Sequence, residues 1–98
     1  MAKTLRFDAA EYLDSTEAIA DYLSEALETG DVEFILQAIG TVSRAVGMTS
    51  VAQAAGLNRE HLYRALNAGG NPELDTVVKV LSALGVQLAA KPKEKVAA

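Results

Sequence analysis

The side chains with the clearest chemical potential lie close together in the second half of the chain. Arg59 and Arg64 each carry a planar guanidinium group, which can donate two parallel hydrogen bonds to the O6 and N7 atoms of guanine. Glu60 can accept from the N4 amine of cytosine, whereas Asn58 and Tyr63 can bind phosphate and fix the register. Taken alone, these residues are equally compatible with a solvated surface, so the elements that present them decide between the two interpretations.

Two short helices are expected to hold these side chains. Apolar spacing predicts one helix at about 48–55 and a second at about 59–66. A helix-turn-helix unit requires a small residue where its helices touch, a glycine in the turn, and apolar anchors after the turn and midway along the second helix. The residues that meet these requirements are Ala52, Gly56, Leu57 and Leu62. The polar side chains then fall on the outer face, and the motif favours DNA binding, with His61 on the flank as a phosphate or packing residue.

The rest of the chain also has helical periodicity and little of the alternation typical of strands, so the expected fold class is all-α. Further helices are expected at about 15–28, 32–46 and 73–84. The segment Val86–Leu88 is expected to be either a short strand or an extended tail, and residues 91–98 a mobile C-terminus.

Polar side chains suited to N-caps precede two of these helices. Asp14 or Ser15 can cap the first, where Asp14 and Glu17 resemble a capping box, and Asp31 can cap the second. Two apolar rows have helical spacing. The row at 32–46 is expected to be buried in the core or at a subunit contact, and it consists of Ile35, Ala38, Ile39, Val42 and Val46, with Phe34 and Leu36 beside them. The row at 73–84 consists of Leu74, Val77, Val78, Leu81 and Leu84.

Charge is distributed unevenly along the chain. Residues 1–47 hold three basic and nine acidic residues, net charge −6, whereas residues 48–98 carry net charge +2. On the first helix the carboxylates share one face, which consists of Glu17, Asp21, Glu25 and Glu28. This face is interpreted either as a solvated surface that keeps the protein soluble or as a docking surface for a basic partner.

Composition excludes several classes of protein. The chain has 98 residues, which predicts one domain spanning residues 1–98. It has no cysteine and one histidine, which argues against disulfides, thiolate zinc sites, iron–sulfur clusters and histidine metal clusters. We expect no metal, no cofactor and no enzymatic activity, because acid and base groups are not paired in an apolar setting. No apolar run approaches a membrane span and no signal peptide is evident, so the expected location is the cytoplasm.

A net charge of +2 in the DNA-binding half is weak for a single DNA-binding unit. A symmetric dimer would double the contacts and address two half-sites about one helical turn apart. The wide apolar surface of residues 32–46 fits such an arrangement, so we expect a homodimer.

The run from Met48 to Leu88, MTSVAQAAGLNREHLYRALNAGGNPELDTVVKVLSALGVQL, resembles the phage-repressor and Cro-like helix-turn-helix domain. This resemblance implies a five-helix, lambda-repressor-like fold with Arg59, Glu60 and Arg64 at base-reading positions. Asn58 would sit at the start of the recognition helix. Many phage repressors have a polar residue where this chain has Met48, so the resemblance assigns phosphate binding to Thr49 and Ser50 instead.

The upstream segments RFDAAEYL, IADYLSEAL and FILQAIGTVSRAVGMTSVA, together with LNREHLYRAL and GNP, resemble the addiction-module antidote family. The resemblance covers about residues 5–90. It implies an antitoxin that neutralises a RelE-like toxin, usually a basic mRNA-cleaving RNase, and represses its own operon. The acidic residues of the first helix would then contact the toxin.

Two other functions remain open at this point. The second function is a phage-type transcriptional repressor or operon regulator without a toxin, and a neighbouring gene for a small basic toxin would favour the antitoxin over it. A helical interaction adaptor without DNA binding is the third possibility, and neutralising both Arg59 and Arg64 without loss of promoter binding would favour it.

Overall fold

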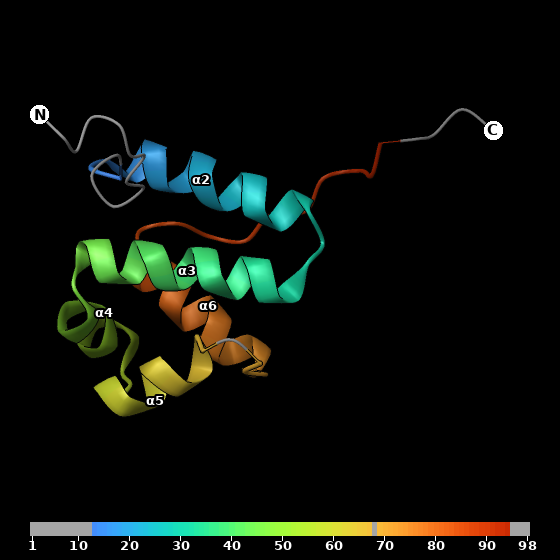
Figure 1. Cartoon of the computed structure of the whole chain (residues 1–98). Helices are drawn as coiled ribbons and strands as arrows, with labels where there is room; N and C mark the ends of the chain where they lie inside the picture. Colours follow the sequence, from blue (N-terminus) through green and yellow to red (C-terminus); the bar gives the residue numbers. More distant parts are fainter. Residues whose placement is uncertain (1–12, 68, 95–98) are drawn as a thin grey trace, which may run out of the picture.

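A computed structural model describes residues 13–67 and 69–94 of the chain. This part of the chain is all-helical (Figure 1), which confirms the predicted fold class. Its five helices are α2 (Thr16–Glu28), α3 (Val32–Val46), α4 (Met48–Ala55), α5 (Arg59–Ala65) and α6 (Leu74–Ala83). Residues 86–88 are extended and form no strand, so the second of the two predicted alternatives is the correct one.

Side-chain caps explain where the first two helices begin. The hydroxyl of Ser15 accepts a hydrogen bond from the Ala18 N–H at 3.1 Å. Ser15 is therefore the N-cap of α2, and the predicted capping box at Asp14 is wrong because Asp14 lies one residue too early. Asp31 caps α3 as predicted, accepting from the Phe34 N–H at 3.3 Å.

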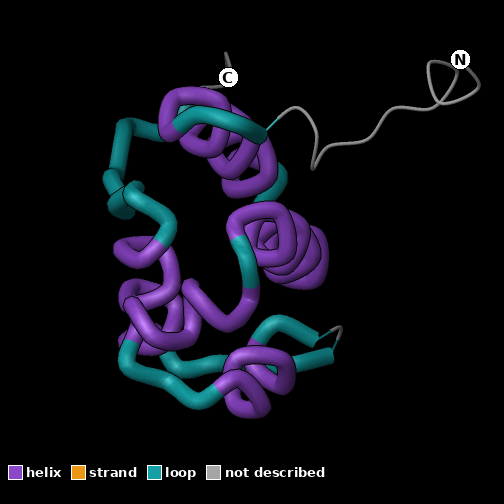
Figure 2. The backbone as a smooth tube through the Cα atoms, turned by 90° about the vertical axis from the view of Figure 1, so that its left-hand side faces the viewer, coloured by secondary structure: helices purple, strands orange, loops and turns teal. Residues whose placement is uncertain are grey.

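The core lies where α3 and α4 meet their neighbours. Helix α2 packs along α3, and α4 packs against α3, α5 and most extensively α6. Figures 1 and 2 show α2 and α5 at opposite ends of this arrangement, with α3 between them. The largest fully buried side chains come from four of the five helices: Ile39, Val42 and Ser43 of α3, Val51 of α4, Leu62 of α5 and Val80 of α6.

The apolar row of α6 is buried only in part. Leu74 is 69% exposed and Val78 is 46% exposed, whereas Thr76 and Val80 are buried. The spacing of apolar residues correctly indicated that Leu81 and Leu84 lie on the buried side of α6. It did not indicate whether Leu74 and Val78 or Thr76 and Val80 share that side. Packing of α4 against α6 determines that choice, because the contact covers the Thr76 and Val80 side.

Helix α3 shows a similar difference at its two ends. Leu36, Ala38, Ile39 and Val42 are buried as predicted, but Val46 and Phe34 are largely exposed. Helix α3 packs against α2 and α4, and these contacts leave Val46 and Phe34 accessible. The apolar surface of this helix is therefore wide without being fully buried.

None of the helices described here is by itself long and apolar enough to cross a membrane. Only α3 and α4 taken together meet that length and composition, and they are bent by 106° at the break between them.

Candidate nucleic-acid interface

A tight turn joins α4 to α5. Gly56 has a φ of +74°, in the left-handed region that glycine adopts without steric cost. The Leu57 N–H then donates to the Ala52 carbonyl at 2.9 Å, which closes the C-terminus of α4. Ala52 is buried, as expected for the small residue of this unit, and Leu57 is partly buried against the core. The turn thus sets the direction of α5.

Helix α5 is fixed to the core by its apolar side. Leu62 is completely buried and Ala65 is buried beside it. At its N-terminus, the side-chain oxygen of Asn58 accepts from the His61 N–H at 2.7 Å. This bond satisfies one of the amide groups that a helix start leaves without an intrahelical partner. The predicted cap is therefore confirmed, and it uses only the carbonyl oxygen of the Asn58 side chain.

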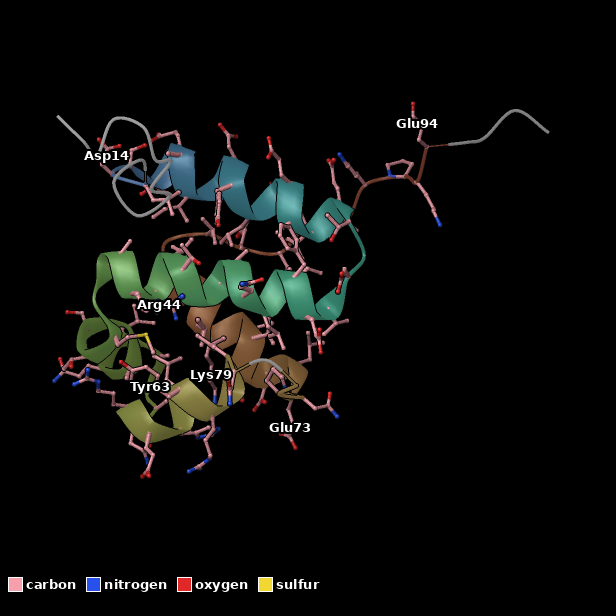
Figure 3. All side chains as sticks on the ribbon, in the orientation of Figure 1. Asp14, Arg44, Tyr63, Glu73, Lys79 and Glu94 are labelled. Atoms are coloured by element: carbon pink, nitrogen blue, oxygen red, sulfur yellow. The ribbon has the colours of Figure 1, made fainter. Side chains whose placement is uncertain are left out.

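The predicted DNA-binding residues of this region share one exposed surface. We call this surface the α5 face; it consists of Asn58, Arg59, Glu60, Tyr63 and Arg64, all of which are exposed. Its polar groups project from α5 away from the core, as the side chains around the labelled Tyr63 show in Figure 3.

Two residues of the α5 face contact each other. The Arg59 Nη2 donates to the Tyr63 hydroxyl at 3.3 Å, and the guanidinium carbon lies 5.5 Å from the centroid of the tyrosine ring. A guanidinium over an aromatic face at this distance is a cation–π contact worth about 0.5–1 kcal/mol at an exposed site. The contact reduces the number of positions that the Arg59 side chain samples, while the residue stays exposed.

Beyond the α5 face, a shallow hollow separates the end of α5 from the start of α6. Its lining includes Arg64, half-buried His61, Asn71 and Glu73. Sequence reasoning placed His61 on this flank but missed Asn71, whose only signal was a polar side chain in the loop before Pro72. Arg64, His61 and Asn71 can donate to an anion there, whereas the carboxylate of Glu73 opposes it.

Thr49 and Ser50 lie on the neighbouring helix. Both are exposed in the first turn of α4, whose N-cap residue, Gly47, has no side chain to cap the helix. Amide groups at an uncapped helix start have no intrahelical acceptor and tend to bind solvent or an anion. This pair therefore has the accessibility that phosphate contact requires, but it belongs to a different helix from the arginines.

The acidic residues predicted to bind a partner form a separate surface. Glu17, Asp21, Glu25 and Glu28 are all exposed on α2, and we call them the acidic face. Oxygen-tipped side chains project along the outer edge of α2 in Figure 3. The structure does not bring them near the α5 face, because α3 lies between α2 and α5.

One residue of the acidic face has a partner from the end of the chain. The Lys91 ammonium donates to Glu28 Oε2 at 2.6 Å, although the two residues are 63 positions apart in the sequence. The hydrogen bond and the positive charge of Lys91 lower the pKa of Glu28 below its ordinary value. Sequence analysis predicted a mobile segment at 91–98; residues 91–94 are extended and exposed, and the rest of that segment lies outside the described residues.

Comparison with known proteins places the chain among small antidotes. Residues 3–92 match the family described as "probable addiction module antidote protein". A Haemophilus influenzae (strain Rd) protein, described only as uncharacterized, is 48% identical over 81 residues, which cover 83% of this chain and 84% of that protein. No solved structure matches the chain significantly. The match over nearly the whole length means that this chain belongs to the family of probable addiction module antidote proteins.

Proposed function

We propose that this chain is a sequence-specific DNA-binding antitoxin that neutralises a RelE-like toxin and represses its own operon. In this proposal α4 and α5 form a helix-turn-helix unit of lambda-repressor-like type, and α5 enters the major groove. Arg59, Glu60 and Arg64 read base edges there, while Asn58 and Tyr63 bind the backbone. Thr49 and Ser50 add phosphate contacts from the start of α4.

The observation that carries the proposal is the two-sided character of α5. Leu62 and Ala65 fix the helix to the core, while all five polar residues of the α5 face are exposed. A recognition helix needs this combination, because base contacts require side chains held in register by a rigid support. The family match supports the antitoxin half of the proposal, since an addiction-module antidote acts on a toxin.

A homodimer is part of the proposal. Two copies related by a two-fold axis would place two α5 helices in successive major grooves roughly 34–36 Å apart. The exposed apolar residues Leu74 and Val78 on α6 support a contact between copies, because isolated subunits gain nothing from exposing them.

The test is binding to the DNA upstream of its own gene, compared with random DNA of equal length across a salt series. We expect Arg59→Ala and Arg64→Ala each to cost about 1–3 kcal/mol on the specific site and to reduce preference at one base position. Arg44→Ala is the matched control, because Arg44 is an exposed arginine outside the α5 face. Its loss should leave the ratio of specific to random binding unchanged.

Equal binding of wild-type protein to both DNAs would contradict repression by base reading. Promoter binding that survives the double substitution of Arg59 and Arg64 would instead favour a helical interaction adaptor. Tight operator binding by a protein whose operon encodes no toxin would favour the phage-type repressor.

A further inference from the structure

Three large apolar side chains are exposed around the turn between α2 and α3. Leu27 is 41% exposed, Val32 is 62% exposed and Phe34 is 47% exposed. We call these three residues the corner patch. All three lie within eight consecutive positions, at the corner where the turn joins α2 to α3, and Val32 and Phe34, two positions apart on α3, point to different sides of that corner. Single exposed apolar residues are common on protein surfaces, but a group at one place is typical of a binding site.

The backbone beneath the corner patch is held by several short-range hydrogen bonds. The Thr29 hydroxyl donates to the Ala26 carbonyl at 2.6 Å and accepts from the Asp31 N–H at 3.1 Å. The Gly30 N–H donates to the Leu27 carbonyl at 3.2 Å, and Gly30 has a φ of +69°. Because this turn is already ordered, a partner that binds the corner patch does not have to order it.

The charges around the corner patch determine which partner fits. Glu28, Asp31 and Glu33 surround it, and the sequence has no lysine or arginine between residues 7 and 43. A second copy of this chain placed on the patch would bring like charges together, which disfavours association. A cationic partner is favoured instead, and Lys91 provides an internal example, because its ammonium binds Glu28 at the edge of the patch.

We infer that the corner patch is the part of the acidic half that binds the toxin. The complementary surface is an apolar cluster bordered by lysine or arginine side chains on a basic polypeptide. In this arrangement the partner closes over the corner and buries Phe34 on one side of it and Val32 on another, while the nearby carboxylates steer the partner and fix its orientation. This inference rests on the proposed antitoxin function and adds the location and chemistry of the toxin contact.

The experiment measures binding of purified full-length chain to the small polypeptide encoded beside it in the same operon, carrying a substitution that abolishes its toxicity. Phe34→Ser and Val32→Ser are compared with Val46→Ser. Val46 is a matched control because it lies on the same helix, at its other end, and is 44% exposed. All three side chains are largely exposed, so thermal unfolding should be little changed, and the same samples provide that measurement.

We expect Phe34→Ser to weaken binding about 30-fold, mainly by faster dissociation, and Val32→Ser about 10-fold, while Val46→Ser binds as wild type does. Glu33→Gln should slow association, and this effect should fade as salt is raised, whereas the Phe34→Ser effect should persist.

The outcomes separate the inference from the function on which it rests. Wild-type binding that the corner variants retain undiminished overturns the inference and leaves the antitoxin function intact. Equal weakening by Val46→Ser and Phe34→Ser also overturns it, because the effect is then not local to the corner. Failure of the wild-type chain to bind the polypeptide overturns the antitoxin function and this inference with it.

Discussion

The α5 face and the acidic face of α2 lie on opposite sides of α3, and they differ in how their charges are arranged. On the α5 face, two arginines alternate with a glutamate, an asparagine and a tyrosine, and Arg59 is held against Tyr63. On the acidic face, four carboxylates of one sign are exposed, and the ion pair of Glu28 comes from a distant part of the chain. Mixed donors and acceptors with restricted positions suit discrimination between sequences. A field of one sign suits attraction of an oppositely charged partner.

The largest expected effect comes from removing the anchor beneath the α5 face. Leu62→Ala deletes a completely buried side chain and should lower the free energy of unfolding by about 2–5 kcal/mol, measured by urea denaturation. That is a large part of the roughly 5–15 kcal/mol typical of a domain, so DNA binding should fall as well. Leu88→Ala is the control, because Leu88 is 41% exposed and lies outside the surfaces proposed to bind a partner, so its effect on unfolding should be clearly smaller. Similar losses in the two variants would contradict the assignment of Leu62 as the anchor.

A smaller loss of stability is expected when the N-cap of α5 or of α2 is removed, and its effect on DNA binding should differ between the two helices. Asn58→Ala and Ser15→Ala each remove a side chain that accepts from an amide three residues later, and each should cost about 1 kcal/mol of stability. Only Asn58→Ala should also reduce operator binding, because Asn58 belongs to the α5 face and Ser15 begins α2. Thermal unfolding and gel-shift titration of both variants test this. A loss of operator binding in Ser15→Ala at a temperature where it remains folded would mean that the two regions are not separate.

The smallest expected effect concerns the contact between Lys91 and Glu28. Because the pKa of Glu28 is lowered in the folded chain, the contact contributes above the ordinary glutamate pKa and is lost as the pH falls through the lowered value. Carbon-detected NMR should therefore show Glu28 titrating below the ordinary glutamate pKa, and Lys91→Ala should return the Glu28 pKa toward that ordinary value. Both groups are exposed, so raising the salt concentration should reduce the difference. An unchanged Glu28 titration in the variant would show that the contact does not persist in solution.

Most of the helices could be predicted from the sequence, because residues typical of helix termini mark where they begin and end. Asp31, Gly47 and Gly56 mark the ends of α3 and α4, and both helices have the predicted bounds. The spacing of Leu62 and Ala65 among polar residues allows only one side of α5 to face the core. The five residues of the α5 face could therefore be picked out from the sequence as candidate DNA contacts, and all five are exposed.

Other features depend on packing between segments and have no local signal. The exposed positions of Leu74 and Val78 follow from which side of α6 meets α4, which periodicity alone does not specify. The hydrogen bond from Lys91 to Glu28 joins residues too far apart in the sequence to be paired by spacing. The corner patch was also missed, because Phe34 was grouped with the wide apolar surface of residues 32–46 and Val32 was not singled out.

The position of α3 between the two faces has a thermodynamic consequence. Helix α3 packs against both α2 and α4, so it is the element that connects the proposed toxin contact to the proposed DNA contact most directly. Any free energy of coupling between the two ligands is reciprocal, so that each changes the affinity for the other by the same factor. If α3 stays rigid, that factor is close to one within a single copy of the chain. Cooperativity between toxin and operator would then arise from how copies assemble on the DNA.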